Sequence, residues 1–307
     1  MIGIVTKSTG SWYRVKYNGE IIDCRIKGKF RLEGLKTTNP VAVGDVVEFT
    51  IDDEKKEGVI TKIDPRRNYL IRKSVNLSKK YHIIAANIDQ AIIIASVSNP
   101  TTTLEFIDRF LISTEAYGIP TTIIVNKIDI LSEEDQEVLA YWLEIYDSIG
   151  YKVILTSAIK KQNFNQIKEL LKDKTTVVSG HSGVGKSSLL NELSAGLDIK
   201  TSEISDMHKQ GKHTTTFAEM HELDFGGAII DTPGIRGLGV VDIEKEELGD
   251  FFPEFLLAKI SCKFHNCNHL NEPNCEVKKQ VEEGDIYPSR YRSYLSILDE
   301  SGELGYR

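Results

Sequence analysis

The sequence predicts three modules: an N-terminal all-β barrel of the OB type, a central α/β domain on a mainly parallel sheet, and a mainly helical C-terminal module. Three observations predict this division. Short β-rich segments fill the first 65 residues, strand-like and helix-like segments then alternate, and three cysteines crowd between residues 262 and 275. We place the module boundaries at residues 1–67, 82–239 and 240–307.

The N-terminal segments GIVTKSTGSWYRVKYN, EIIDCRIKGKF, NPVAVGDVVEFTI and EGVITKIDP are rich in β-branched and aromatic residues and are separated by Gly, Asn and Pro. Short, regularly spaced strands favour a small closed barrel. Aromatic and basic side chains are interleaved here, namely Trp12, Tyr13, Tyr17 and Phe30 with Arg14, Lys16, Arg25, Lys27, Lys29 and Arg31. Either they form a face that stacks on bases and neutralises phosphates, or the aromatics are core and the charges face solvent.

Charge is distributed unevenly along the chain. The formal net charge of −7 by itself argues against nucleic-acid binding. Residues 1–73, however, hold 15 Lys and Arg against 10 Asp and Glu, a balance of +5, so the rest of the chain carries −12. This asymmetry indicates an N-terminal module that faces a polyanion.

Composition also bears on the compartment. No stretch approaches the roughly 20 apolar residues that span a bilayer, and the start MIGIVTKSTGSWYRV has no apolar run typical of a secretory signal. Four cysteines in a chain of this length do not make a disulfide framework. We therefore expect a cytoplasmic protein that has no membrane partner and is a monomer.

The central pattern begins after residues 66–81, which we predict to be a basic polar link. Strand-like segments follow in QAIIIASVS, PTTIIVNKIDI, YKVILTSA and TTVVSG. Helix-like segments lie between them in LEFIDRFLISTEAYGI, EEDQEVLAYWLEIYDSIG and NFNQIKELLKD. Strands and helices alternating at this spacing predict βαβ units and a mainly parallel sheet with both faces covered.

A P-loop pattern, GHSGVGKS, runs from Gly180 to Ser187 between the strand TTVVS and the helix KSSLLNELSAGL. Glycines allow the backbone N–H groups to surround a phosphate, which then meets a helix N-terminus. The Lys186 ammonium would neutralise the β- and γ-phosphates, and the Ser187 hydroxyl would ligate magnesium.

Two further motifs fit a nucleoside triphosphate with magnesium. FGGAIIDTPG ends a strand in Asp231-x-x-Gly234, where Asp231 would reach magnesium through water and the Gly234 N–H would contact the γ-phosphate. Between this motif and the P-loop lies GKHTTT, residues 211–216, whose Thr215 would complete the magnesium shell when the γ-phosphate is bound. Thr214 is the alternative if that ligand lies one position earlier.

The base is predicted to be guanine. Asn126-Lys127-Ile128-Asp129 follows a strand directly, and the Asp129 carboxylate would accept hydrogen bonds from guanine N1–H and the exocyclic amino group. Adenine has neither donor there, and an unpaired charged group is costly. Ser157-Ala158 after YKVIL supplies the second base contact through its backbone.

The order of these motifs is circularly permuted. Ordinary GTPases begin with the P-loop, whereas here the NKxD and SA motifs precede the P-loop and DTPG. Joining the old termini and reopening the chain elsewhere preserves the sheet. We therefore predict a circularly permuted P-loop GTPase domain, in which the segment after DTPG leads directly into the C-terminal module.

The C-terminal module carries a metal-ligand pattern. Cys262, Cys267, His269 and Cys275 offer three thiolates and one imidazole within fourteen residues. This is a complete tetrahedral Cys₃His set, so it predicts one structural zinc per chain and a zinc-binding domain folded by its metal. Cys24 is predicted to be a buried thiol outside this set.

The whole chain resembles the RsgA (YjeQ) family of small-ribosomal-subunit-dependent GTPases of bacteria. The resemblance rests on the permuted order, GxHTTT, GHSGVGKSS, DTPG, FFPEF, Cys-x4-Cys-x-His-x5-Cys with EPNCEV, and the tail GDIYPSRYRSYLSILDE. It implies docking on the 30S subunit and 16S rRNA in late maturation, with GTP hydrolysis stimulated by the subunit. His181 departs from the Gln or Asn expected in relatives.

The resemblance also bears on catalysis. Ile235 follows Gly234 where Ras-like enzymes place the Gln that orients water. The family pattern implicates His213 of the GxHTTT motif instead, and the alternative is that His213 only faces solvent. Two other functions stay open. One is an RNA-binding scaffold with GTP as a structural ligand. The other is a large-subunit assembly GTPase, although similar permuted GTPases of that kind lack both the basic barrel and the Cys₃His motif.

The residues expected to bind GTP or GDP and magnesium are Asn126, Lys127, Ile128, Asp129, Ser157, Ala158, Gly180, His181, Ser182, Gly183, Val184, Gly185, Lys186, Ser187, Ser188, Thr215, Asp231 and Gly234.

Overall fold

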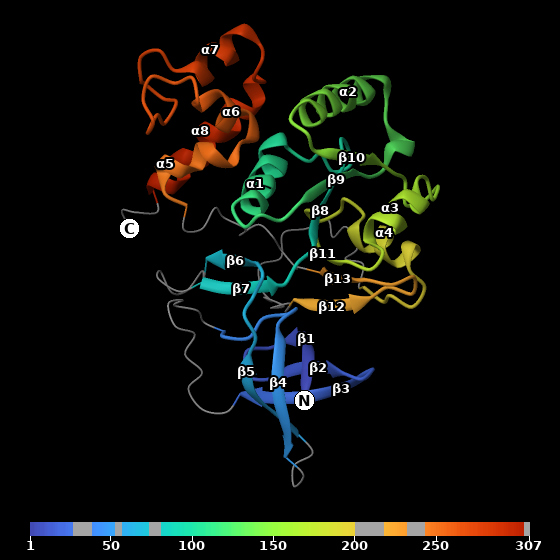
Figure 1. The fold of residues 1–307 in the computed structure, drawn as a ribbon. Helices are drawn as coiled ribbons and strands as arrows, with labels where there is room; N and C mark the ends of the chain where they lie inside the picture. Colours follow the sequence, from blue (N-terminus) through green and yellow to red (C-terminus); the bar gives the residue numbers. More distant parts are fainter. Residues whose placement is uncertain (27–38, 53–56, 74–80, 200–217, 232–242, 304–307) are drawn as a thin grey trace.

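The structure is a computed structural model, and it describes residues 1–26, 39–52, 57–73, 81–199, 218–231 and 243–303. A strand barrel lies at one end, a helical module at the other, and an α/β domain between them (Figure 1). Within the described residues, an 11-stranded sheet runs in the order β10-β9-β8-β11-β13-β12-β1-β2-β3-β5-β4. The sheet therefore continues from the α/β domain into the barrel.

The barrel confirms the predicted N-terminal module. Its strands are β1 Ile2–Ser8, β2 Tyr13–Tyr17, β3 Glu20–Ile26, β4 Val46–Asp52 and β5 Glu57–Ile63. They pair antiparallel except β3 with β5, which is parallel. Because β1 pairs with both β2 and β4, the sheet closes on itself. Cys24 is fully buried in the barrel core, as predicted.

The barrel aromatics divide between the two interpretations. Tyr13 is only 1% exposed, and Tyr17 packs edge-on against Phe49, so both serve the core. Trp12 is 39% exposed and has the Arg25 guanidinium 4.9 Å from its ring centroid. Phe30, Lys27, Lys29 and Arg31 lie outside the described residues.

The segment at residues 66–81, predicted as a basic polar link, is partly a β-hairpin. β6 Tyr69–Lys73 pairs antiparallel with β7 Tyr81–Ala86. The prediction was wrong because Ile71 and Ile83, buried beside Ala42 and Ala86, give the segment a small core of its own. The charges between those residues hid this pattern in the sequence.

The central sheet has the predicted parallel character. Its elements are β8 Gln90–Ala95, α1 Leu104–Glu115, β9 Thr121–Val125, α2 Glu133–Ser148, β10 Lys152–Leu155, α3 Phe164–Leu171, β11 Thr175–Ser179, α4 Lys186–Leu193, β12 Glu219–Glu222 and β13 Ala228–Asp231. Among the described strands of this domain, β12 alone runs antiparallel, to its neighbour β13. The sequence EMHE is short and polar, so β12 was not predicted.

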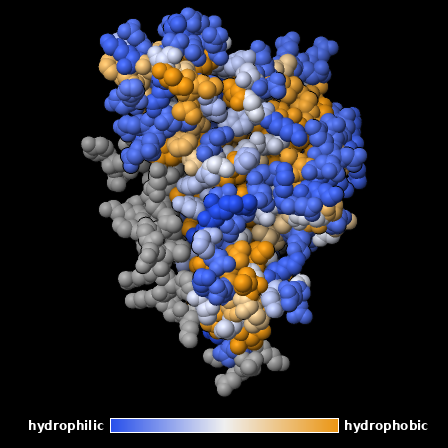
Figure 2. Space-filling model, in the orientation of Figure 1, coloured by the Kyte–Doolittle hydropathy of each residue, from blue (hydrophilic) through white to orange (hydrophobic). Residues whose placement is uncertain are grey.

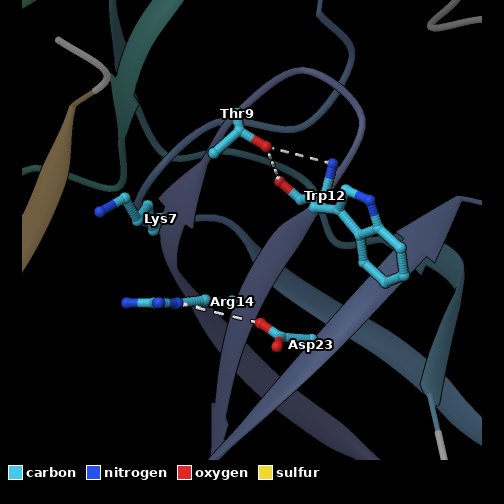
Figure 3. Close-up of a pocket in the computed structure, with 5 residues that line it drawn as sticks. All are labelled: Lys7, Thr9, Trp12, Arg14 and Asp23. Carbon is cyan, nitrogen blue, oxygen red and sulfur yellow. Dashed lines mark hydrogen bonds and ion pairs between the residues drawn. The ribbon is translucent and has the colours of Figure 1, made fainter.

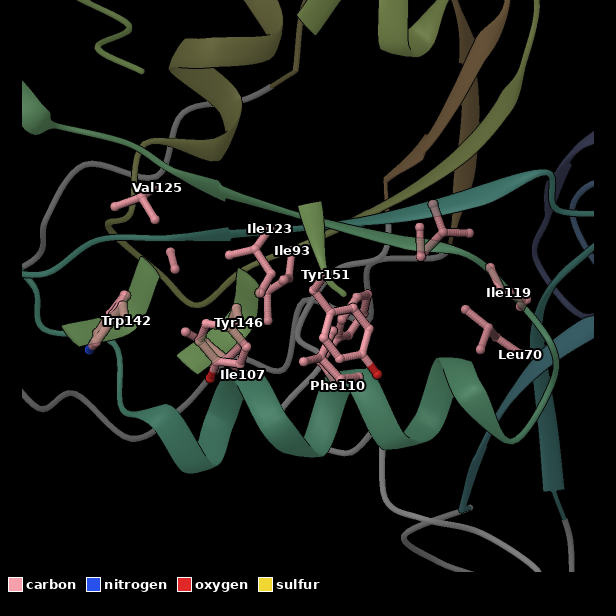
Figure 4. Packing of buried hydrophobic residues seen from close by; sticks show 14 of the residues in the cluster. Leu70, Ile93, Ile107, Phe110, Ile119, Ile123, Val125, Trp142, Tyr146 and Tyr151 are labelled. Carbon is pink, nitrogen blue, oxygen red and sulfur yellow. The ribbon is translucent and has the colours of Figure 1, made fainter. Parts of the chain in front are cut away.

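Helices cover both faces of this sheet. Along β8, Ile93 joins the cluster packed against α1 and α2 (Figure 4). Ile92 and Ile94 join a second cluster, with residues of α3 and α4. This alternation follows the two-residue period of a strand. The Thr103 side chain accepts a hydrogen bond from the Phe106 N–H and begins α1, and Ser132 begins α2 with a capping box.

The C-terminal module is helical, as predicted. It contains α5 Lys245–Leu248, a 3₁₀ turn Gly249–Phe251, α6 Pro253–Lys259, α7 Glu276–Glu283 and α8 Pro288–Glu303. No helix among the described residues combines the length and apolar character that crossing a membrane requires, and hydrophilic side chains cover much of the face in Figure 2.

A buried ionic network joins this module to α1. Arg290 of α8 donates from Nη1 to Asp108 Oδ1 at 2.6 Å and from Nε to Glu254 Oε1 at 2.7 Å. Tyr146 O–H donates to the same Asp108 oxygen at 2.9 Å. Arg290 is 1% exposed and Asp108 is fully buried. The network therefore fixes α8 against the helix that follows β8.

Candidate nucleotide site and metal cluster

The P-loop lies where the sequence placed it, between β11 and the first turn of α4. Gly183 and Gly185 have φ of +86° and +88°, a region that L-residues with a Cβ rarely adopt. A Cβ on Gly185 would also lie 2.5 Å from Asn126 Nδ2. These glycines therefore permit the close approach between the loop and the strand-end residues of β9.

Asn126 connects three predicted motifs. It is 1% exposed at the end of β9, and its Nδ2 donates to the Val184 carbonyl at 2.9 Å. Its Oδ1 accepts from the Ala158 N–H at 3.1 Å. The sequence assigned Asn126 only to the base pocket, but the structure shows that it also holds the P-loop against the SA segment.

Lys127 extends along the same loop. Its backbone is left-handed, with φ of +67°, and its Nζ donates to the Gly183 carbonyl at 2.7 Å and to the Asn99 carbonyl. Burial lowers the pKa of Lys127, and nearby Asp129 opposes that effect. Asp129 is half-buried in the 3₁₀ turn Ile128–Ile130. The residues predicted to recognise the base thus lie directly beside the P-loop.

Two charged residues meet at the carboxyl ends of β11 and β13. Lys186 Nζ donates to Asp231 Oδ1, and the two side chains are 16% and 20% exposed. Ser187 and Ser188 occupy the first turn of α4 beside Lys186. Because β11 and β13 are parallel neighbours, the predicted phosphate and magnesium residues lie at one edge of the sheet.

Sequence reasoning missed the segment after β8 as part of this site. Thr102 Oγ1 lies 2.7 Å from His181 Nε2, and the Phe106 ring meets the His181 ring edge-on at 5.5 Å. Pro100 lies 3.3 Å from a Cβ built on Gly183. The available signal was position, since polar residues following the buried strand QAIIIA reach the carboxyl edge of a parallel sheet.

Part of the predicted site lies outside the described residues. This concerns His213, Thr214, Thr215, Gly234 and Ile235. Of the DTPG motif, the structure therefore describes Asp231 alone.

The four predicted metal ligands converge. The ligand atoms of Cys262, Cys267, His269 and Cys275 all lie within 4.8 Å of one another. His269 Nδ1 is 3.4 Å from Cys275 Sγ and 3.8 Å from Cys262 Sγ, while its Nε2 is buried without a hydrogen bond in the described structure. Three sulfurs and one nitrogen gathered around one point fit a tetrahedral metal ion, so the cluster could hold one.

Backbone geometry supports this convergence. His269 has φ of +57°, which turns its ring back toward the thiols, and it is 1% exposed. Burial raises the pKa of the Cys267 thiol to about 12. Metal ligation requires the thiolate, so a bound cation would reverse that preference.

The P-loop is hydrogen-bonded to the loops that carry the NKxD and SA motifs, and along the chain those two motifs precede the P-loop. This combination defines the circularly permuted GTPases. The family model of the RsgA GTPase matches residues 63–241, and the family model of the RsgA N-terminal domain matches residues 2–60. The chain belongs to the RsgA GTPase family and is a GTP hydrolase by that membership.

Individual relatives are similar to this chain over nearly its full length. The small ribosomal subunit biogenesis GTPase RsgA of Christiangramia forsetii is 54% identical, with 100% of this chain and 98% of the relative covered. Its counterpart in Flavobacterium psychrophilum is 52% identical, with 99% and 94% covered. Among solved structures, YjeQ from Thermotoga maritima has a TM-score of 0.78 at 37% identity, covering 100% and 99%. YloQ, a circularly permuted GTPase, has a TM-score of 0.74 at 33% identity, covering 98% and 95%.

Proposed function

We propose that this chain binds the small ribosomal subunit in the cytoplasm, acts in its late maturation, and hydrolyses GTP with stimulation by the subunit. The relatives named above are small-subunit biogenesis GTPases, which supports the partner. The observation that carries the nucleotide part is the bonding of Asn126 to both Val184 and Ala158. These two hydrogen bonds connect the loop proposed to bind the phosphates with the loops proposed to bind the base, which supports a single nucleotide contacting all of them.

The described residues suit distinct roles toward Mg-GTP. Lys186 would neutralise the β- and γ-phosphate oxygens, Ser187 would ligate magnesium, and Asp231 would reach it through water. Ser157 is fully buried and its Oγ accepts from the Lys160 N–H at 3.0 Å, which fixes the turn that presents Ala158 to the base. The proposed site also includes Thr215, Gly234 and His213, whose roles are inferred from the sequence motifs alone.

Purified ribosomal subunits test the proposal directly. Multiple-turnover GTP hydrolysis should rise at least tenfold when 30S subunits are added, because the partner orders catalytic groups. A 50S subunit should give no comparable rise. Equal turnover with and without 30S would favour the RNA-binding scaffold with structural GTP, and stimulation by 50S alone would favour a large-subunit function.

Asp129 is expected to determine base specificity. GTP and GDP should bind at least roughly a hundredfold more tightly than ATP, because the carboxylate finds no donor on adenine. Asp129→Asn should shift preference toward xanthine nucleotides, which carry a carbonyl in place of the guanine amino group. Calorimetric titration measures both effects. Glu133→Gln on the neighbouring α2 is the control, and equal affinity of the parent protein for ATP and GTP would refute the base-pocket assignment.

Zinc is the metal that we propose for the Cys₃His cluster. Elemental analysis of protein purified without chelator should give one zinc per chain. Cys267→Ala should lose that zinc and weaken binding to 30S while GTP affinity stays within a few-fold, because the nucleotide residues lie outside the cluster. Cys24→Ala, which alters a buried thiol in the barrel, is the matched control and should keep its zinc. Full zinc occupancy in Cys267→Ala would contradict the ligand set.

The barrel is the proposed rRNA contact. Trp12 presents a partly exposed ring beside Arg25, and aromatic rings with nearby cations are the usual platform for unpaired bases. Tyr13 is excluded from that role by its burial in the barrel core, whereas Tyr17 is partly buried against Phe49.

A further inference from the structure

Two contacts between the barrel and the segments that follow it differ in character: one is made with β7 of the hairpin and the other with β12 of the GTPase sheet. The first is a buried backbone anchor, in which the Ala86 N–H donates to the Val43 carbonyl at 2.8 Å and Asn87 Nδ2 donates to the Gly44 carbonyl at 3.0 Å. A Cβ on Gly44 would lie 2.1 Å from the Ala86 carbonyl oxygen, so the two backbones are in direct contact. This anchor holds the barrel in place independently of the second contact.

The second contact is a charged junction between β1 and β12. Lys7 is the β1 residue paired in register with Glu219 of β12. Lys7 Nζ donates to Glu219 Oε2 at 2.6 Å, and Arg14 Nη1 lies 3.7 Å from Glu219 Oε1. Lys16 pairs with Glu222 in the same way. Two acidic residues of β12 therefore pair with three cations of the barrel, which leaves one positive charge in excess at the junction.

Two of these cations, Lys7 and Arg14, also line a cavity of the barrel. It measures about 320 Å³ and is lined by Lys7, Thr9, Trp12, Arg14 and Asp23. Figure 3 shows Lys7 and Arg14 extending to one side of the cavity and the Trp12 ring lying at the other. An aromatic ring with two cations beside it matches a nucleotide, which offers a base to stack and a phosphate to neutralise.

The ion pairs at the junction are exposed enough to be exchanged. The side chains of Lys7 and Glu219 are 27% and 32% exposed. Arg14, the second partner of Glu219, is 52% exposed, and Glu222, the partner of Lys16, is 58% exposed. Exposed ion pairs stabilise a structure only weakly, because water and salt screen them. A phosphate backbone, in contrast, binds several cations at once, and the release of its counterions favours that binding.

We propose that single-stranded RNA binds this face of the barrel by exchanging its phosphates for the Glu219 and Glu222 carboxylates, and thereby loosens the junction between β1 and β12. The inference rests on the proposed rRNA contact of the barrel. β12 starts three residues after Thr216 in the sequence, so the exchange acts on the strand that follows the GxHTTT motif. RNA on the barrel would thus be coupled to the GTPase site, while the buried anchor keeps the barrel attached.

Charge-neutral variants of the full-length, zinc-loaded protein test this exchange. Fluorescence anisotropy with a labelled single-stranded RNA of about ten nucleotides should show about three- to tenfold tighter binding by the double variant Glu219→Gln with Glu222→Gln, because the competing carboxylates are gone. The matched control is Glu48→Gln with Asp64→Asn. It removes two carboxylates that pair with Lys62 on the same barrel, away from β12, and should stay within about twofold of the parent protein.

Hydrogen exchange tests the loosening itself. RNA should increase exchange within Glu219–Glu222 of the parent protein while protecting the segment around Trp12. Trp12→Leu should weaken binding of the RNA and leave binding of an inorganic polyphosphate unchanged, since only the RNA has bases to stack. If polyphosphate and RNA lose affinity equally, the ligand is a general polyanion and the assignment to RNA is refuted.

Two negative results have separate meanings. If the parent protein binds RNA but the β12 double variant behaves like the control, the exchange is refuted and the proposed function stands. If the parent protein binds no RNA at all, both the exchange and the proposed rRNA contact are refuted.

Discussion

Arg290→Met is expected to lower the free energy of unfolding by about 3–5 kcal/mol, because it leaves Asp108 and Glu254 buried without their cation. Burial lowers the pKa of Arg290, but the two carboxylates together raise it above its usual range, so the guanidinium stays charged in the folded protein. Denaturant unfolding followed by circular dichroism measures the change. Lys279→Met, which removes a cation that is 58% exposed, should change stability by less than about 0.5 kcal/mol.

The decrease in the free energy of unfolding of Arg290→Met, its stability deficit, should also depend on pH. Burial is the largest influence on Asp108 and raises its pKa, whereas Arg290 lowers it. Without Arg290 the folded-state pKa rises further above the unfolded value, so the folded state of the variant retains a proton that the unfolded state releases. The deficit should then be smallest at acidic pH and should grow as pH rises through the folded pKa. A deficit that is the same at every pH, or no larger than that of Lys279→Met, would contradict this account of the network.

His213→Ala is expected to cut 30S-stimulated GTP turnover by roughly tenfold to a thousandfold, the range for a lost positioning or acid–base group. Phosphoryl transfer requires an in-line water, and the Ile235 side chain can neither accept nor donate a hydrogen bond to hold one. We propose that His213 supplies that function. GTP affinity should stay within a few-fold, since the contacts proposed for the P-loop and for Asp129 are unchanged.

Lys186→Ala provides the contrast, because it removes a charge from the phosphates in the ground state and should weaken nucleotide binding itself. The His213→Ala protein should instead remain on the subunit in its GTP state, which a pelleting assay with 30S measures. If His213→Ala turns over GTP at the parent rate with saturating 30S, His213 is a solvent-facing residue and another group holds the water.

The sequence predicted the fold well where periodicity was strong. The run QAIIIA is buried at every position and apolar from Ala91 to Ala95, because Ile93 and its neighbours Ile92 and Ile94 face helices on opposite sides of the sheet. The strand β12 and the β6–β7 hairpin were not predicted, since EMHE has little apolar character and the hairpin core is interrupted by charges. The module boundaries at residues 67, 82 and 239 stay predictions.

The candidate sites were predictable to a different degree. Glycine spacing and cysteine spacing indicate a backbone shape and a donor set, so the P-loop and the four metal ligands converge as expected. Contacts between distant segments are not encoded by spacing. The contact of Thr102 with His181 and the pairing of Asp108 with Arg290 therefore required the structure, although Asp108 within EFIDRFL was a visible exception to an apolar helix.

The closed barrel also affects how the sheet meets other chains. Of the strands that the structure describes in the 11-stranded sheet, only β10 has a single neighbour. β10 is four residues long and begins with the exposed Lys152, and short charged edge strands resist intermolecular pairing. At the opposite end of the α/β part of the sheet, β1 of the barrel pairs with β12. A chain that lacks the barrel would therefore expose β12 as a second open edge. The N-terminal barrel therefore also protects the GTPase sheet from edge-to-edge aggregation.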